Sequence, residues 1–206
     1  MSEYIAKNAF LTEAEMTINA RYIYQYLTAR GWSPTAVCGM LGNMETESTI
    51  NPAIWQNLDE GNTSGGYGLV QWTPASKFIN WCATNHLSTD EMDSALKRIE
   101  WELENGEQYY PTDAYPLTFA EFKVSNRTPY YLAMAFLANY ERPADPSQPA
   151  RGEQARKWYN LLKGSGGSEG GSSEGSEGDS SGESELPARK NKPMPLWLLL
   201  AASRRR

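Results

Sequence analysis

The chain has 206 residues, 40% of them hydrophobic and 12% aromatic, which is enough for one domain with a substantial core. Its formal net charge of −6 argues against a nucleic-acid-binding protein, because such proteins carry a basic patch or stripe. One histidine, His86, and two distant cysteines, Cys38 and Cys82, give no zinc-ligand spacing. We therefore expect no metal or other cofactor, two buried thiols and a surface histidine.

Helical periodicity and helix-start signals predict that residues 1–163 form a mainly α-helical domain. Capping boxes mark three starts: Thr12 with Glu15, Ser88 with Glu91, and Thr118 with Glu121. Ser-Pro or Thr-Pro pairs mark three more, at 33–34, 73–74 and 128–129. An apolar stripe from Ala155 to Leu162 predicts a last helix.

Residues 51–72, "NPAIWQNLDEGNTSGGYGLVQW", interrupt this helical pattern. They are rich in Asn, Gly, Ser and Thr, and they predict turns with a small hairpin. A long irregular segment inside a helical domain is more often functional than a simple connection. We therefore expect this segment to line a cleft.

Directly before that segment, "NMETES" places Glu45 and Glu47 at the end of the helix predicted from residue 34. At about 100° per residue, the two acids flank the apolar stripe on opposite sides, so we do not expect them to share one proton. Periodicity does not choose between them, and both can equally be solvent-facing acids at a helix end. Acid-catalysed cleavage of a glycosidic bond requires a carboxyl group in apolar surroundings, which Met40 and Met44 supply to Glu47.

Groups that complete such a site are present in residues 51–72. Asp59 and Glu60 are candidates for a second carboxylate. Aromatic and amide side chains of the kind that hold sugar rings follow the same segment: Trp55, Gln56, Tyr67, Gln71 and Trp72.

The amino-acid composition of the chain changes after residue 163. Residues 164–185 contain only Gly, Ser, Glu and Asp, which predicts a flexible linker. Residues 186–206 form a short basic and apolar tail, in which residues 194–202 are too few to cross a bilayer as a helix. Contact of this run with a membrane surface or a partner, and an unstructured end, are both open. The N-terminal sequence predicts no secretory signal.

"NMETES" followed by "GYGLVQW" resembles the lysozyme-like superfamily, in which a Glu-Ser pair ends the catalytic helix. More specifically, residues 38–76 resemble the N-terminal lysozyme domain of tail-knob peptidoglycan hydrolases from short-tailed phages of Gram-positive bacteria. The stretches "MDSALKRIEWE" and "LAMAFLANYERPADPSQPARGEQARKWY" extend the resemblance over about residues 10–163.

This resemblance implies an α+β lysozyme-like fold with Glu47 as the catalytic acid and Glu45 as a solvated neighbour. It implies that Gln71 lines the cleft, that Ser48 and Tyr140 belong to the substrate-binding region, and that Glu141 is structural. The motif does not fix the second carboxylate, for which we expect Asp59. The phage proteins continue into a zinc endopeptidase domain, which a chain with one histidine cannot form.

The predicted function is a bacteriolytic peptidoglycan hydrolase that cleaves β-1,4 linkages of the cell-wall glycan, either from a virion tail or as a lysis protein. Its partners are then peptidoglycan and virion tail proteins. One alternative is a lytic transglycosylase, which uses Glu47 alone and leaves anhydro-muramyl ends. The other is a non-catalytic wall-binding module, which keeps the aromatic groove and does not need Glu47.

Overall fold

The computed structural model describes residues 3–163, which form the predicted mainly helical domain. The linker at 164–185 and the tail at 186–206, with its apolar run, lie outside the described residues. The α-helices are α1 Glu13–Thr28, α2 Pro34–Ser48, α3 Ser76–Thr84, α4 Met92–Glu104, α5 Phe119–Val124, α6 Pro129–Phe136 and α7 Pro149–Lys163. No helix in this part of the chain is both long and apolar enough to cross a membrane.

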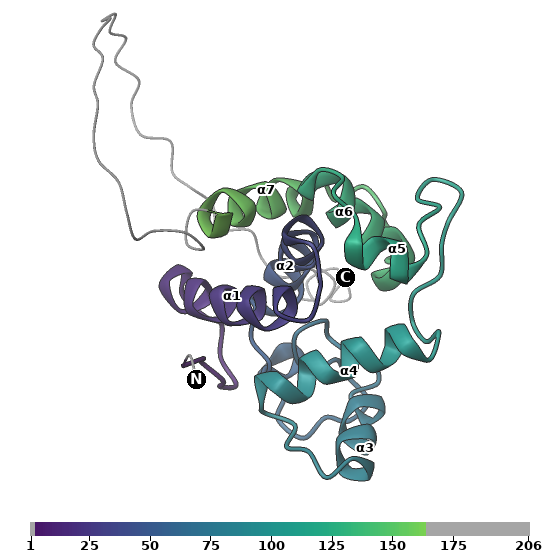
Figure 1. Cartoon of the computed structure of the whole chain (residues 1–206). Helices are drawn as coiled ribbons and strands as arrows, with labels where there is room; N and C mark the ends of the chain where they lie inside the picture. The colour runs from purple at the N-terminus through teal and green to yellow at the C-terminus, as the bar shows by residue number, and fades with distance from the viewer. Residues whose placement is uncertain (1–2, 164–206) are drawn as a thin grey trace, which may run out of the picture.

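Helix α2 is the centre of the fold (Figure 1). It packs against α7, α6 and α1, while α3 and α4 pack against each other on the opposite side of the molecule. Most of α2 is buried, including both Met40 and Met44. Gly42 lets α7 approach closely, because a Cβ at this position would lie 2.3 Å from the carbonyl oxygen of Arg151. The close contact of α2 and α7 decides which side chains meet the end of α2.

The helix-start predictions are confirmed at four positions. Thr12 and Thr118 form capping boxes, and Ser33 and Thr128 accept a hydrogen bond from the first turn of the helix that follows. Two predictions are wrong. Helix α3 begins only at Ser76, because Thr73 donates its hydroxyl hydrogen bond to the Gln71 carbonyl instead of capping a helix. Helix α4 has no side-chain cap, because Ser88 hydrogen-bonds to Asp90.

Residues 51–72 are irregular, as predicted, but the expected hairpin does not form within them. The segment contains a 3₁₀ turn, η1 Gln56–Leu58, and isolated antiparallel bridges from Tyr67 to Trp55 and to Trp72. Ser48, the last residue of α2, donates its hydroxyl hydrogen bond to the Leu69 carbonyl and joins the segment to the helix end. The segment is therefore held in place without strand pairing.

Helix α6 continues directly into a π-helical turn, η2 Leu137–Glu141. The wider turn is followed by Arg142 in a left-handed conformation, with φ of 48°. Single π-helical turns of this kind occur frequently at functional sites. Here the turn carries Tyr140 and Glu141, two residues of the "NYERP" stretch.

The two cysteines are free and buried, and His86 is exposed, as the sequence predicts. Burial raises the pKa of the Cys38 thiol to about 12. No group of His, Cys, Asp and Glu side chains between residues 3 and 163 is arranged to hold a metal ion.

Candidate active site

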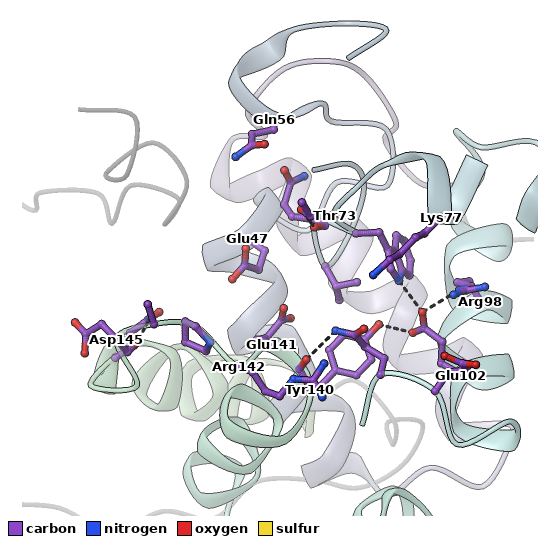
Figure 2. A pocket seen from close by; sticks show the side chains of 18 residues that line it. Glu47, Gln56, Thr73, Lys77, Arg98, Glu102, Tyr140, Glu141, Arg142 and Asp145 are labelled. Carbon is purple, nitrogen blue, oxygen red and sulfur yellow. Dashed lines mark hydrogen bonds and ion pairs between the residues drawn. The ribbon is translucent and has the colours of Figure 1, made fainter. Parts of the chain in front are cut away.

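A pocket of about 590 Å³ opens beside the C-terminal end of α2 (Figure 2). It is lined from α2 by Glu47, from the irregular segment and the start of α3, from α4, and from the chain that follows α6. This volume is within the usual range for small-molecule and cofactor sites. The pocket therefore lies where the α2–α6–α7 bundle meets the part of the fold built on α3 and α4.

Glu47 is buried, with 8% of its surface exposed, and it is held by Arg151 of α7. Arg151 Nη2 donates to Glu47 Oε1 at 2.5 Å, Nη1 donates to Asn43 Oδ1 at 3.1 Å, and Nε donates to Gln148 Oε1 at 2.7 Å. Arg151 is itself fully buried. The guanidinium thus fixes the orientation of the Glu47 carboxyl group toward the pocket.

Glu45 is not the solvated neighbour that we expected. It is as buried as Glu47, and its carboxylate accepts hydrogen bonds from Lys157 Nζ at 2.9 Å and Trp158 Nε1 at 2.7 Å. Both donors belong to α7, which covers this side of α2. Glu45 is therefore occupied in the helix interface, and it does not line the pocket. The prediction failed because helix periodicity cannot show which flank of α2 a later helix covers.

A second buried carboxyl group, Glu102 of α4, lies at the other wall of the pocket. It accepts hydrogen bonds from Trp72 Nε1 at 3.0 Å, from Arg98 Nε at 2.8 Å and from the Tyr140 hydroxyl group. Figure 2 shows these contacts converging on the carboxyl group. Burial raises the pKa of Glu102, and its three donors oppose that shift. This cluster joins the irregular segment, α4 and the π-helical turn into one wall.

Glu141 also lines the pocket, and sequence reasoning gave it only a structural role. Its Oε1 atom is buried and has no hydrogen-bond partner among the described residues. Figure 2 shows Glu47 and Glu141 on the same side of the pocket, one from α2 and one from the turn after α6. Burial raises the pKa of Glu141 well above its ordinary value, and the charge of Glu47 raises it further.

The structure brings together some of the predicted site residues and not others. Gln56, Gln71, Trp72 and Tyr140 line the pocket with Glu47. Ser48, Trp55 and Tyr67 do not line it.

Each residue of the second group has an evident packing role instead. Ser48 hydrogen-bonds within the helix end, Trp55 packs edge-on against Tyr67, and the Tyr67 hydroxyl donates to the Thr89 carbonyl. Gln71, which lines the pocket, is only partly hydrogen-bonded within the protein. Its Nε2 atom donates to two carbonyl groups, while its buried Oε1 atom has no partner among the described residues.

Asp59, the expected second carboxylate, is exposed and lies at the end of η1. It accepts a hydrogen bond from Asn62 Nδ2 at 3.0 Å and does not line the pocket. Glu60 is also exposed and outside the pocket lining. Their role in catalysis stays a prediction, to which the pocket geometry gives no support.

Sequence reasoning did not identify Glu102 as a pocket residue or Arg151 as the partner of Glu47. The i, i+4 spacing of Arg98 and Glu102 on a predicted helix was a usable signal for their ion pair, at 2.8 Å. No local signal could have paired Arg151 with Glu47, because that contact depends on the packing of α7 on α2.

Two comparisons with known proteins bear on this site. The family model described as phage tail lysozyme matches residues 18–162, which include every helix from α2 to α6. The chain is also 59% identical over 163 residues to "Morphogenesis protein 1" of Bacillus phage B103. The match covers 79% of this chain but 44% of that relative, so the chain spans less than half of the relative's length.

Proposed function

Because the chain belongs to the phage tail lysozyme family, we propose that it is a glycosidase that cleaves the β-1,4-linked glycan of bacterial peptidoglycan, with Glu47 as the proton donor. The observation that carries this proposal is the position of Glu47. Its side chain is buried at the end of α2, is oriented by Arg151, and borders a pocket that is lined from both parts of the fold. Virion tail proteins are proposed partners, in keeping with the description of the family as phage tail lysozyme.

The pocket supplies the kinds of groups that glycan cleavage needs. A proton donor must reach the leaving oxygen, and a second group must act on the oxocarbenium-like centre that forms. Gln56 and Gln71 provide amide groups in the lining, and the buried Trp72 and Tyr140 side chains form part of the same wall. The unpartnered Oε1 of Gln71 is an acceptor for a sugar hydroxyl or amide hydrogen.

The decisive experiment is Glu47→Gln, with release of reducing ends from purified peptidoglycan as the measurement. We expect a loss of about 10²- to 10⁴-fold, since the amide cannot donate the proton. Glu45→Gln is the matched control, because Glu45 is an equally buried acid on the same helix that does not border the pocket. Rates are normalised to folded protein by circular dichroism. If Glu47→Gln retains near-wild-type activity, Glu47 is not the acid.

A lytic transglycosylase is the second candidate, and the position of Asp59 favours it. That reaction uses one acid and no water, so it does not need the exposed Asp59 carboxylate. Mass spectrometry of the digest separates the two reactions. Anhydro-muramyl products identify the transglycosylase, and reducing muramyl ends identify the hydrolase. A non-catalytic wall-binding module would yield neither product.

A further inference from the structure

Two buried acids of the pocket wall, Glu47 and Glu102, are each paired with a buried arginine, whereas Glu141 is half-buried and its buried Oε1 atom has no hydrogen-bond partner among residues 3–163. Arg98 is ion-paired with Glu102 at 2.8 Å, and Arg151 is ion-paired with Glu47 at 2.5 Å. Glu141 lies between these two pairs in the pocket lining and takes part in no ion pair within 4.0 Å among residues 3–163. An isolated buried carboxylate is costly, and such a group normally becomes neutral by keeping its proton.

The neighbouring Arg142 does not neutralise Glu141. Its left-handed backbone turns the chain away at this point, and its guanidinium carbon lies 4.7 Å from the centroid of the exposed Tyr110 ring. Arg142 is itself exposed, so water screens its charge. Glu141 and Arg142 both line the pocket, but Arg142 is exposed whereas the Glu141 Oε1 atom is buried.

We propose that Glu141 is protonated in the resting protein and that Glu47 and Glu141 form a pair carrying one proton, with Arg151 as their shared counter-ion. This inference rests on the proposed function of Glu47. In the reaction, the O–H bond of Glu141 breaks as an O–H bond forms on Glu47. Glu47 then passes this proton to the glycosidic oxygen as the bond to the sugar carbon breaks. The proton returns to the pair from the attacking water or, in a transglycosylase, from the attacking sugar hydroxyl.

The groups that face Glu141 support this assignment. Glu47 from α2 and Glu102 from α4 raise its pKa, whereas Arg151 from α7 and Arg142 after the π-helical turn lower it, and burial is the largest effect. Two interacting carboxyl groups titrate as a pair, so a change at one must move the titration of the other. A Glu141 side chain remote from Glu47 would not follow the charge of Glu47 in this way.

The test is carbon NMR of the full chain with glutamate labelled at Cδ. The Glu141 signal is assigned by its loss in Glu141→Gln. We expect it to titrate above the exposed glutamates, and we expect Glu47→Gln to move that midpoint downward because a like charge is removed. Glu104→Gln, which removes an exposed acid outside the pocket, is the control and should leave the midpoint unchanged. Titration of Glu141 together with the exposed glutamates, near about pH 4.3, overturns the proposal.

Activity gives a second, independent readout. Glu141→Gln should lower glycan release by more than about tenfold near pH 7 and by less near pH 5, because the supply of protons from bulk solvent rises as the pH falls. Glu141→Asp should recover part of the rate, since it restores a carboxyl group. Equal activity of Glu141→Gln and wild type at both pH values contradicts the proposal.

The two proposals fail in different ways. An active Glu47→Gln variant refutes the proposed function, whatever the NMR titration shows. An ordinary titration of Glu141 beside an inactive Glu47→Gln variant refutes only the shared proton.

Discussion

Replacing Arg151 by methionine tests the arrangement of the candidate acid through stability, without any assay of activity. The substitution keeps an unbranched side chain of similar length and removes every guanidinium donor. Three acceptors then lose a partner in the α2–α7 interface or beside it: Glu47 Oε1, Asn43 Oδ1 and Gln148 Oε1. Of these, the Glu47 carboxylate is the one that carries charge.

The expected loss follows from the burial of this ion pair. The Arg151 side chain is 1% exposed and that of Glu47 is 10% exposed. Removing one partner of a buried pair costs about 3–5 kcal/mol, because an uncompensated charge stays in the interior. For a domain of this size, such a loss lowers the melting temperature by about 6–20 °C.

The assay is denaturant unfolding of the full chain followed by tryptophan fluorescence, with Arg156→Met as the matched control. Arg156 lies on the same helix and pairs with Glu153 at 2.8 Å, but the two side chains are 53% and 61% exposed. Exposed pairs of this kind contribute about 0–1 kcal/mol. We therefore expect Arg156→Met to unfold close to wild type under the same conditions.

A double variant shows whether the charge of Glu47 causes the loss. Adding Glu47→Gln to Arg151→Met removes the buried carboxylate whose ion pair with Arg151 is lost, so the double variant should be more stable than Arg151→Met alone. Strictly additive losses would mean that the two side chains do not interact. That result, or a loss below about 1 kcal/mol for Arg151→Met, would refute the reasoning.

Three further predictions concern the same region. Gly42→Ala should lower the unfolding free energy by about 1–3 kcal/mol or more in thermal melts, since its Cβ would lie 2.3 Å from the Arg151 carbonyl oxygen and would push α7 from α2. Tyr140→Phe should cost about 1–3 kcal/mol in denaturant unfolding, because the buried Glu102 carboxylate loses a donor; an unchanged midpoint would contradict that contact. Because the pKa of Glu141 is raised, the folded protein still holds a proton on Glu141 at pH values above about 4.3, where the unfolded chain has released it. The free energy of unfolding contributed by this group therefore falls as the pH rises through the folded pKa. The slope is at most about 1.4 kcal/mol per pH unit. Glu141→Gln should make that decline shallower in denaturant melts at a series of pH values, and an unaltered slope would count against it.

Local sequence patterns predicted much of the helical framework and the general place of the site. Capping residues such as Thr12 and Thr118 act within a few residues of their own helices, so their signals can be read directly from the chain. The irregular segment after α2 lines the pocket together with Glu47, as the sequence pattern predicts for a cleft-lining segment. Ser88 shows the limit of such signals, because Asp90 provides a nearer partner than the expected cap.

What the sequence by itself determined is therefore the helical fold, the family resemblance, and the irregular segment that follows α2. Only the tertiary structure decided the environment of each acid. Glu45 and Glu47 both meet α7, yet Glu45 is held within the interface while Glu47 borders the pocket. Glu141 reaches the same pocket through the turn after α6. The physical reason is that burial and charge compensation are set by contacts between segments about a hundred residues apart, and local periodicity contains no information about them.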